Sequence, residues 1–315
     1  MAGTLLIMVA CLTWAIDTLI RYPLLGAGYT TLQVVFTEHL ILTVLMLPFG
    51  WRYRHHFRQL SWRMTLCMLF IGGVGSALGT LAFTEAFHYL NPTLVILLQK
   101  LQPVIAILLA CFVLKERIQS SFLLWACVLI AGSLIMMWSD ILSLAQNNLH
   151  ATRQGSDIIK GYLYALGAVV AWGGATVCGK YLSQQACPPN AILFGRFFSG
   201  FCVLALFVSL QPSAIKPMEM GDWESVAIMA CLSGLAGMWF YYQGLRYIPA
   251  RRATLVELTF PVFAAAVNWL FLGQTLSFYQ IVGGVVLLAG NLGLQLRETK
   301  KVIQPTRAAL SKQQA

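Results

Sequence analysis

The chain repeats itself at a constant offset of 158 residues, so that residue i in the first half matches residue i + 158 in the second. Between residues 79 and 134, twelve residues are identical at this shift without a gap. The matches include types that are harder to attribute to an apolar composition: Trp14 and Trp172, Phe36 and Phe194, Tyr89 and Tyr247, Pro103 and Pro261, and Gly132 and Gly290. Two similar, mostly apolar halves are typical of membrane transporters built from internal repeats around a central site.

The composition supports a polytopic membrane protein. Of the 315 residues, 58% are hydrophobic and only 10% are charged, whereas a soluble domain averages about 25% charged. Apolar segments of about 20 residues can span the hydrocarbon as helices. Ten segments qualify: 4–22, 31–50, 64–87, 92–114, 120–139, 160–182, 189–210, 223–245, 251–272 and 277–296. The first of them lacks a basic start and a clear cleavage site, so we expect it to be retained.

The distribution of the 21 Lys and Arg residues predicts the orientation. If the N-terminus is cytoplasmic, fifteen of them fall on the cytoplasmic side, four on the other side and two within spans. This bias predicts that both termini are cytoplasmic. The net charge of +10 is therefore explained by topology, and we expect no nucleic-acid partner. Five spans per half is an odd number, so the second half enters from the opposite side, and the sequence predicts two inverted five-helix repeats.

The expected organisation has four parts. They are a first repeat at 1–139, a polar linker at 140–159, a second repeat at 160–297 and a polar cytoplasmic tail at 298–315. No segment has room for a soluble catalytic module, and there is no Walker A motif, so a transporter would be driven by a gradient.

The residues carry a resemblance to a known family. The segment that begins "FTEAFHYLNPTLVILLQKLQPVIAILLACFVLKERIQ" and its second copy, "YYQGLRYIPARRATLVELTFPVFAAAVNWLFLGQTLS", resemble the drug/metabolite transporter superfamily, specifically its EamA-type branch. "TWA" near Trp14, "AWGG" near Trp172 and Arg196 match further family positions, and the resemblance covers about residues 3–297. Two positions depart from the family pattern: Gln274 stands opposite Glu116, and Glu38 stands where the first half usually has Arg.

Ionisable residues inside a membrane are costly and are by default candidates for function. Seven lie clearly inside the predicted spans, away from their ends: Asp17, Glu38, His39, Glu85, Lys100, Arg196 and Glu257. Lys100 and Glu257 occupy similar depths in the fourth and ninth spans, with the amides of Gln99 and Gln102 beside Lys100. We expect these four residues to bind substrate, the cation taking a carboxylate and the anion an ammonium. The alternative is an internal salt bridge that only holds the halves together.

The remaining candidates lie on other spans. Trp14 and Trp172 are predicted to form two aromatic walls of the substrate cavity, and Tyr241 and Gln243 to bind substrate from the eighth span. Asp17 is a proton-coupling candidate, or a simple partner of Arg21 four residues later.

Glu85 and Glu257 are also proton-coupling candidates. Glu85 is expected to share a helical face with His88 and Tyr89, near the external end of its span, although ordinary interfacial placement explains it equally well. The repeat-related Glu38 and Arg196 are expected to pair across the centre or to hold helix ends.

The residues and the resemblance together predict a multi-pass inner-membrane secondary transporter of small polar or amphipathic metabolites, such as amino acids. We expect it to work by alternating access as an exporter or exchanger, with proton coupling as an option. The expected partners are the substrate and the bilayer, with no cofactor or metal, and a monomer is one option for the oligomeric state. A lipid or polyprenyl flippase and a multidrug efflux protein of the same fold are the alternatives. A membrane enzyme is not expected, because His55 and His56 lie in a basic loop without an acidic neighbour.

Overall fold

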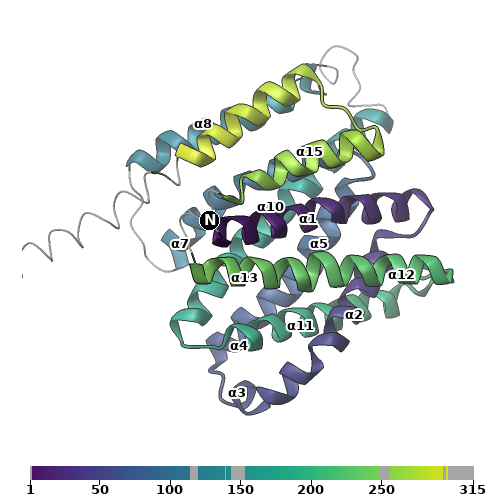
Figure 1. The fold of residues 1–315 in the computed structure, drawn as a ribbon, viewed down its shortest axis with the longest axis vertical. Helices are drawn as coiled ribbons and strands as arrows, with labels where there is room; N and C mark the ends of the chain where they lie inside the picture. Colours follow the sequence, from purple (N-terminus) through teal and green to yellow (C-terminus); the bar gives the residue numbers. More distant parts are fainter. Residues whose placement is uncertain are drawn as a thin grey trace, which may run out of the picture.

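The structure is a computed structural model that describes residues 2–113, 120–138, 140–142, 153–247, 256–293 and 296. Helices make up the regular structure of these residues, and none of them forms a strand. Figure 1 shows long helices whose axes run across the picture, with the N-terminus at one end of α1. The predicted all-α class is confirmed.

Seven helical segments are long and apolar enough to cross a membrane. They are Ala2–Gly26, Thr31–Arg52, Trp62–Ala86, Pro92–Leu109, Ser156–Gln184, Pro189–Leu210 and Met220–Tyr241. Three shorter apolar helices, Leu123–Met136, Thr259–Leu272 and Phe278–Gly293, coincide with the other three expected spans. The chain is thus a multi-pass membrane protein, while the count of ten spans stays a prediction.

The described elements divide between the two halves of the chain. The first half contains α1 (Ala2–Gly26), α2 (Thr31–Arg52), α3 (Arg54–Arg58), α4 (Trp62–Leu69), η1 (Phe70–Leu78), α5 (Gly79–Ala86), α6 (Pro92–Leu98), η2 (Gln99–Leu101), α7 (Gln102–Val113) and α8 (Ser120–Met136). The second half contains α10 (Arg153–Gln184), α11 (Pro189–Leu210), η4 (Pro212–Ala214), α12 (Met220–Met229), η5 (Ala230–Ala236), α13 (Gly237–Tyr247), α15 (Thr259–Leu272) and the helix Phe278–Gly293.

Local sequence explains where several helices begin and end. Thr30 and Asn91 are N-caps whose side chains accept backbone N–H groups of α2 and α6, and Pro92 occupies the first position of α6, where its missing N–H costs nothing. Gly273 ends α15 in the left-handed conformation (φ 63°), which glycine adopts without steric cost.

Both halves interrupt their helices at equivalent positions. The third segment of each half contains a π-helical stretch, η1 in the first half and η5 in the second, and adding 158 to the last residue of η1 gives the last residue of η5. The fourth segment of each half leaves the α-helix as well, at η2 in the first half and at a turn over residues 257–258 in the second. Such irregular backbone is tolerated at membrane depth where it is buried in protein or lines a cavity.

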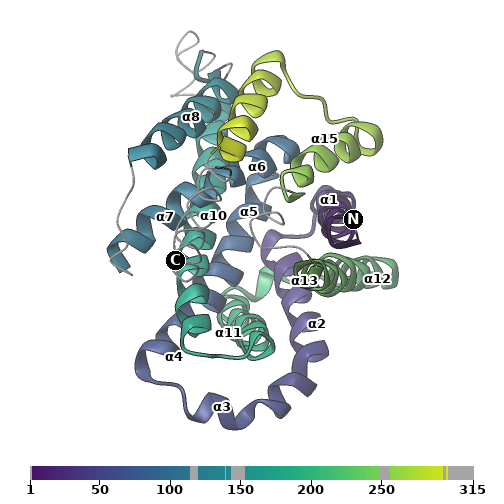
Figure 2. The ribbon, with the colours of Figure 1, turned by 60° about the vertical axis from the view of Figure 1, so that its left-hand side comes forward.

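The two halves interdigitate. Helix α1 packs against α12, α13 and α15 of the second half, whereas α10 packs against α4, α5, α6 and α7 of the first (Figure 2). Helix α2 packs along α11. Helix α8 crosses the helix Phe278–Gly293, where Gly132 and Gly283 allow close backbone contact. Residues from both halves therefore surround the same central space.

Two expectations need adjustment, and two further positions are not described. Helix α10 begins at Arg153, so the last part of the segment expected as a linker is helical. Helix α5 ends at Ala86, and His88 lies in the turn that follows, so the helical face expected for Glu85 does not extend to it. Glu116 and the tail at 298–315 lie outside the described residues.

Candidate functional site

A cavity of about 680 Å³ lies between the two halves. Its wall includes α1, α2, α5, α10 and α11 as well as the helix breaks of both halves. Near the α10–α11 connection it is lined by Ser183 and Pro189, which are exposed. Toward the α1–α2 connection it is lined by Arg21 and Glu38, which are only 4% and 7% exposed. The cavity therefore reaches the surface at the α10–α11 end and is closed at the α1–α2 end.

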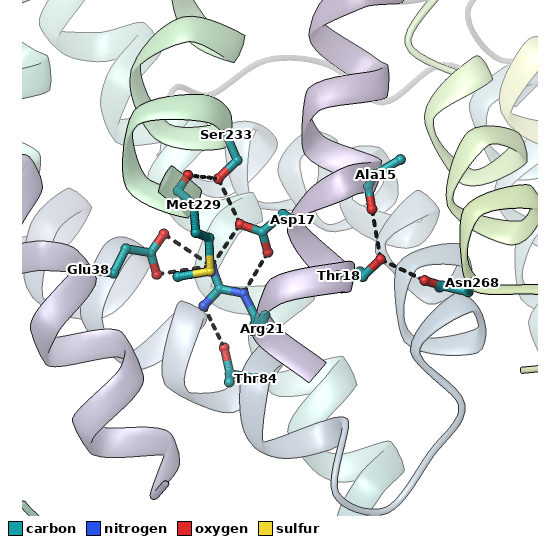
Figure 3. Close-up of polar contacts among 9 residues, drawn as sticks. All are labelled: Ala15, Asp17, Thr18, Arg21, Glu38, Thr84, Met229, Ser233 and Asn268. Atoms are coloured by element: carbon teal, nitrogen blue, oxygen red, sulfur yellow. Dashed lines mark hydrogen bonds and ion pairs between the residues drawn. The ribbon is translucent and has the colours of Figure 1, made fainter. Parts of the chain in front are cut away.

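The closed end contains one guanidinium and two carboxylates (Figure 3). Arg21 Nε donates to Asp17 Oδ2 at 2.7 Å, and Arg21 Nη2 lies 3.0 Å from Glu38 Oε2. Arg21 Nη1 donates to Thr84 Oγ1 at 3.2 Å, and Ser233 Oγ donates to Asp17 Oδ1 at 2.7 Å. We call Asp17, Arg21 and Glu38 the triad; it connects α1 to α2 and, through the two hydroxyls, to α5 and η5.

The triad is part of a larger buried polar region that the sequence did not predict. Thr18 Oγ1 donates to Asn268 Oδ1 at 2.6 Å, and Asn268 Nδ2 donates to Thr93 Oγ1 at 3.0 Å, which links α1, α15 and α6. On the other side, Ser76 Oγ lies 2.9 Å from His39 Nε2 and accepts from Arg196 Nε at 3.3 Å. Ser76, Thr93 and Asn268 are uncharged polar residues within apolar spans, and this feature of the sequence could have indicated that they belong to a buried polar region.

Glu38 does not form the predicted ion pair with its repeat-related residue Arg196. Its partner is Arg21, which lies closer because α1 brings the guanidinium beside α2. The spacing of Asp17 and Arg21 correctly predicts their pair, because residues four apart face each other on a helix.

Lys100 and Glu257 both line the cavity, at the helix breaks of the two halves. Tyr241 donates its hydroxyl to Glu257 Oε1 at 2.7 Å. Lys100 Nζ lies 5.4 Å from the centre of the Phe260 ring, and it is not within ion-pair distance of a carboxylate among the described residues. The salt-bridge alternative is therefore not realised in this conformation.

Trp14 on α1 and Trp172 on α10 both line the cavity, one from each half of the chain. Trp14 Nε1 donates to Ser233 O at 3.1 Å, and the Trp14 ring packs 6.2 Å from Phe260. The Trp172 ring packs 5.2 Å from Phe83. These contacts hold both indoles in place, so the cavity has two rigid aromatic walls.

The other predicted site residues separate into two groups. Gln99 and Gln102 line the cavity, and Gln102 Nε2 donates to Thr176 Oγ1 at 3.1 Å. Tyr241 and Gln243 are not among its lining residues, although Tyr241 holds Glu257. Glu85 is not a lining residue either; it is half-buried and accepts from Tyr89 Oη at 3.5 Å.

Connections of the two halves meet beyond the triad. Gln33 Nε2 donates to Lys216 O at 2.7 Å, and Lys216 N donates to Gln33 Oε1 at 3.1 Å. Tyr29 donates its hydroxyl to Asp222, and this hydrogen bond to a carboxylate raises the pKa of Tyr29. These bonds connect the α1–α2 connection and the start of α2 to the segment before α12 and to α12 itself.

Comparison with known proteins identifies the family. The model of the EamA-like transporter family matches residues 1–138 and 159–295. The riboflavin transporter ImpX of Fusobacterium nucleatum is 30% identical over 91% of this chain and 95% of its own. Escherichia coli has a relative named as the uncharacterized inner membrane transporter YhbE, which is 26% identical over 74% of this chain and 71% of its own.

A solved crystal structure with 15% sequence identity aligns with a TM-score of 0.59 and covers 93% of this chain and 97% of that one. This likeness supports the fold alone. The relatives that are named as transporters agree with the expectation that the chain is not an enzyme. The resemblance to the drug/metabolite transporters is confirmed, and the chain belongs to the EamA-like transporter family.

Proposed function

We propose that this transporter carries riboflavin or a chemically similar metabolite: one with a flat aromatic ring system, several hydrogen-bonding groups and no net charge. The substrate would occupy the cavity between the halves with its ring system against Trp14 or Trp172. A volume of about 680 Å³ falls in the range of about 300–1,000 Å³ that is typical of sites for drug-sized ligands. The 30% identity to a riboflavin transporter over nearly the whole chain supports this choice of substrate.

The charge balance of the cavity is the observation that carries the proposal. Its described lining contains three acidic and three basic side chains: Asp17, Glu38, Glu257, Arg21, Lys100 and Arg196. Opposite charges in equal number give a bound ligand no net electrostatic preference, so a neutral or zwitterionic substrate fits better than an anion or a cation. The aromatic walls then select for a flat, polarisable body, and Lys100 can donate to a substrate carbonyl.

The transport cycle that we propose is alternating access by two inverted five-helix repeats, at 1–139 and 160–297, joined by the linker and followed by the cytoplasmic tail. The equivalent helix breaks and the reciprocal packing of α1 and α10 support this arrangement. With both termini in the cytoplasm, the α1–α2 end would face outward and the described conformation would be open to the cytoplasm. The proposal also includes an inner-membrane location and a monomeric state. It includes export or exchange as the direction of transport, and coupling to protons through a carboxylate.

An amino acid is the second candidate substrate, and the arrangement of Lys100 and Glu257 favours it. Both charges face the same cavity without pairing with each other, so a zwitterion could place its carboxylate near Lys100 and its ammonium near Glu257. Glu257 already accepts from Tyr241, which leaves its second oxygen for a ligand. If neither riboflavin-like metabolites nor amino acids bind, a lipid flippase or a multidrug efflux protein becomes the preferred assignment.

Binding to the purified protein tests the substrate. Riboflavin is titrated against the protein in detergent, and the quenching of tryptophan fluorescence is followed together with the melting temperature, which a ligand of the folded state raises. We expect saturable binding that weakens in Trp172→Leu and persists in the control Trp223→Leu, since Trp223 is 41% exposed and outside the cavity. Binding of amino acids but not riboflavin would favour the second candidate, and unchanged binding in both Trp14→Leu and Trp172→Leu would reject the cavity as the site.

A further inference from the structure

We propose that Glu38 is a proton-linked gate: the α1–α2 end of the cavity opens with the uptake of one proton by this carboxylate. The inference rests on the proposed alternating access, because it concerns the closed end that must open in the other half of the cycle. It concerns a residue that the sequence assigned to pairing with Arg196 and that no comparison assigns to coupling. It is carried by the geometry of the triad.

The contacts of Arg21 divide into one that stays within a helix and two that cross between helices. Asp17 lies one turn away on α1 itself, so this pair survives any movement of α1 as a rigid body. Glu38 lies on α2 and Thr84 on α5, and α2 packs mainly along α11 and not along α1. If α1 moves away from α2 and α5 at this end, Arg21 keeps Asp17 and loses both Glu38 and Thr84.

The charges of the triad make Glu38 the surplus carboxylate. One guanidinium faces two carboxylates, and all three residues are less than 9% exposed. When the end is closed, Arg21 is paired with both carboxylates. When it opens, Asp17 retains the cation, and Glu38 loses its ion-pair partner while it faces the water that enters this end. Without the guanidinium the anion is less stabilised relative to the protonated acid, which is neutral and can donate a hydrogen bond.

The other charged or titratable groups around Glu38 do not replace this role. His39 lies on α2 itself, and its ring is fixed between Val35 O and Ser76 Oγ. Arg196 on α11 acts on Glu38 electrostatically without forming an ion pair with it, and donates to the same Ser76 hydroxyl. The groups that α5 and η5 contribute to the triad, Thr84 and Ser233, are hydroxyls that do not ionise in this range. Arg21 is thus the cation that the opening of this end would withdraw from Glu38.

The proton balance is simple. On opening, water reaches Glu38, one of its oxygens forms an O–H bond with a proton from that water, and the carboxyl group becomes neutral. On closing, Arg21 returns, the O–H bond breaks, and the proton leaves to the water of the cavity, which is then open at the α10–α11 end. One linked proton changes the ratio of open to closed molecules by up to about tenfold per pH unit, with acid favouring the open state.

The test measures the gate directly and needs no substrate. Spin labels are attached to Ala27→Cys, at the end of α1, and His88→Cys, after α5, in full-length protein whose native cysteines have been replaced. Both positions are exposed in the closed conformation. The distance distribution is recorded by pulsed electron–electron resonance in nanodiscs between pH 5 and pH 9. We expect a longer distance to gain population as the pH falls.

Variants test whether Glu38, and not another titratable group such as His39, is responsible for the pH dependence. In Glu38→Gln, which imitates the neutral acid, we expect the longer distance at all pH values, whereas the control Glu85→Gln, a carboxylate outside the cavity, should titrate like the parent. A Glu38→Gln variant that keeps the parental titration overturns the proposal, as does loss of the titration in His39→Gln alone. If Glu38→Gln does not fold, Glu38→Asp should titrate with a shifted midpoint, and an unshifted midpoint overturns the proposal.

This outcome is distinguishable from that of the substrate assignment. Riboflavin binding at a fixed pH tests the proposed substrate whether or not the gate titrates. The distance titration tests Glu38 whether or not riboflavin binds. A protein that titrates but binds no riboflavin keeps the gate and loses the substrate.

Discussion

The crossing of α8 with the helix Phe278–Gly293 gives a prediction whose size follows from the structure. A Cβ atom added at Gly283 would lie 2.5 Å from Gly132 O and 2.5 Å from Met136 N. Both are backbone atoms, which cannot rotate away as the end of a side chain could. Ordinary contact begins at 3.4 Å, so Gly283→Ala requires the two helices to separate by about 0.9 Å.

Overpacking of this kind costs about 1–3 kcal/mol, and the backbone partners place Gly283→Ala toward the upper part of that range. Because alanine is a better helix former than glycine, the same substitution also stabilises the helix by up to about 1 kcal/mol. We therefore expect a net destabilisation of about 1–2 kcal/mol. The matched control is Gly167→Ala on α10, where an added Cβ has no neighbour within 4 Å, so only the gain in helix propensity remains.

The assay is thermal unfolding of both variants in the same detergent, followed by tryptophan fluorescence. Gly283→Ala should melt below the parent protein, and Gly167→Ala at or above it. If Gly283→Ala melts at or above Gly167→Ala, the two helices do not approach as closely as the structure shows, and the reasoning is refuted.

Three further predictions concern charged and polar groups. Arg21→Ala leaves two buried carboxylates without their cation, and we expect a loss of about 3–5 kcal/mol, seen as a lower melting temperature; a change below 1 kcal/mol would contradict the triad. Lys100→Met removes an ammonium without a described ion-pair partner, so the melting temperature should rise while riboflavin binding weakens about tenfold or more; a fall in both would indicate a structural role. The hydrogen bond to Asp222 raises the folded-state pKa of Tyr29 above its unfolded value of about 10, so this stabilisation is present below about pH 10 and is lost as the pH rises through the folded value. Tyr29→Phe should therefore remove part of the alkaline fall in melting temperature, and an unchanged fall would contradict the bond.

Sequence patterns predicted the parts of this protein that depend on one helix at a time. Long apolar segments predicted the helices, and the pair of Asp17 and Arg21 follows from a spacing of four residues. The positions of Lys100 and Glu257 followed from the repeat, since Glu257 is equivalent to Gln99, the residue before Lys100, and equivalent positions of two similar halves approach a common centre. The walls formed by Trp14 and Trp172 followed for the same reason.

The contacts between helices could not be predicted in this way. Helical spacing states which residues share a face, but the rotation of each helix against its neighbours is set by packing of the whole bundle. Glu38 therefore had two potential partners, and the one on α1 is realised. Glu85 lies outside the cavity for the same reason. Asn268 is recognisable as a polar residue in an apolar helix, but its partners on α1 and α6 follow only from the packing of the bundle.

The positions where the two halves differ explain why one end of the cavity is closed and the other open. Adding 158 to the numbers of the triad gives Ala175, Gly179 and Arg196, which also line the cavity but include no carboxylate. A Cβ atom added at Gly179 would have no neighbour within 4 Å. In the proposed inverted repeat, the second half therefore lacks the ionic tie with which the first half closes the α1–α2 end. Among the residues that the structure describes, no buried ion pair of this kind lies at the α10–α11 end, whereas opening of the α1–α2 end must separate Arg21 from Glu38. The asymmetry places the proton-linked step on one side of the cycle only, although the two halves share their helices, their breaks and their aromatic walls.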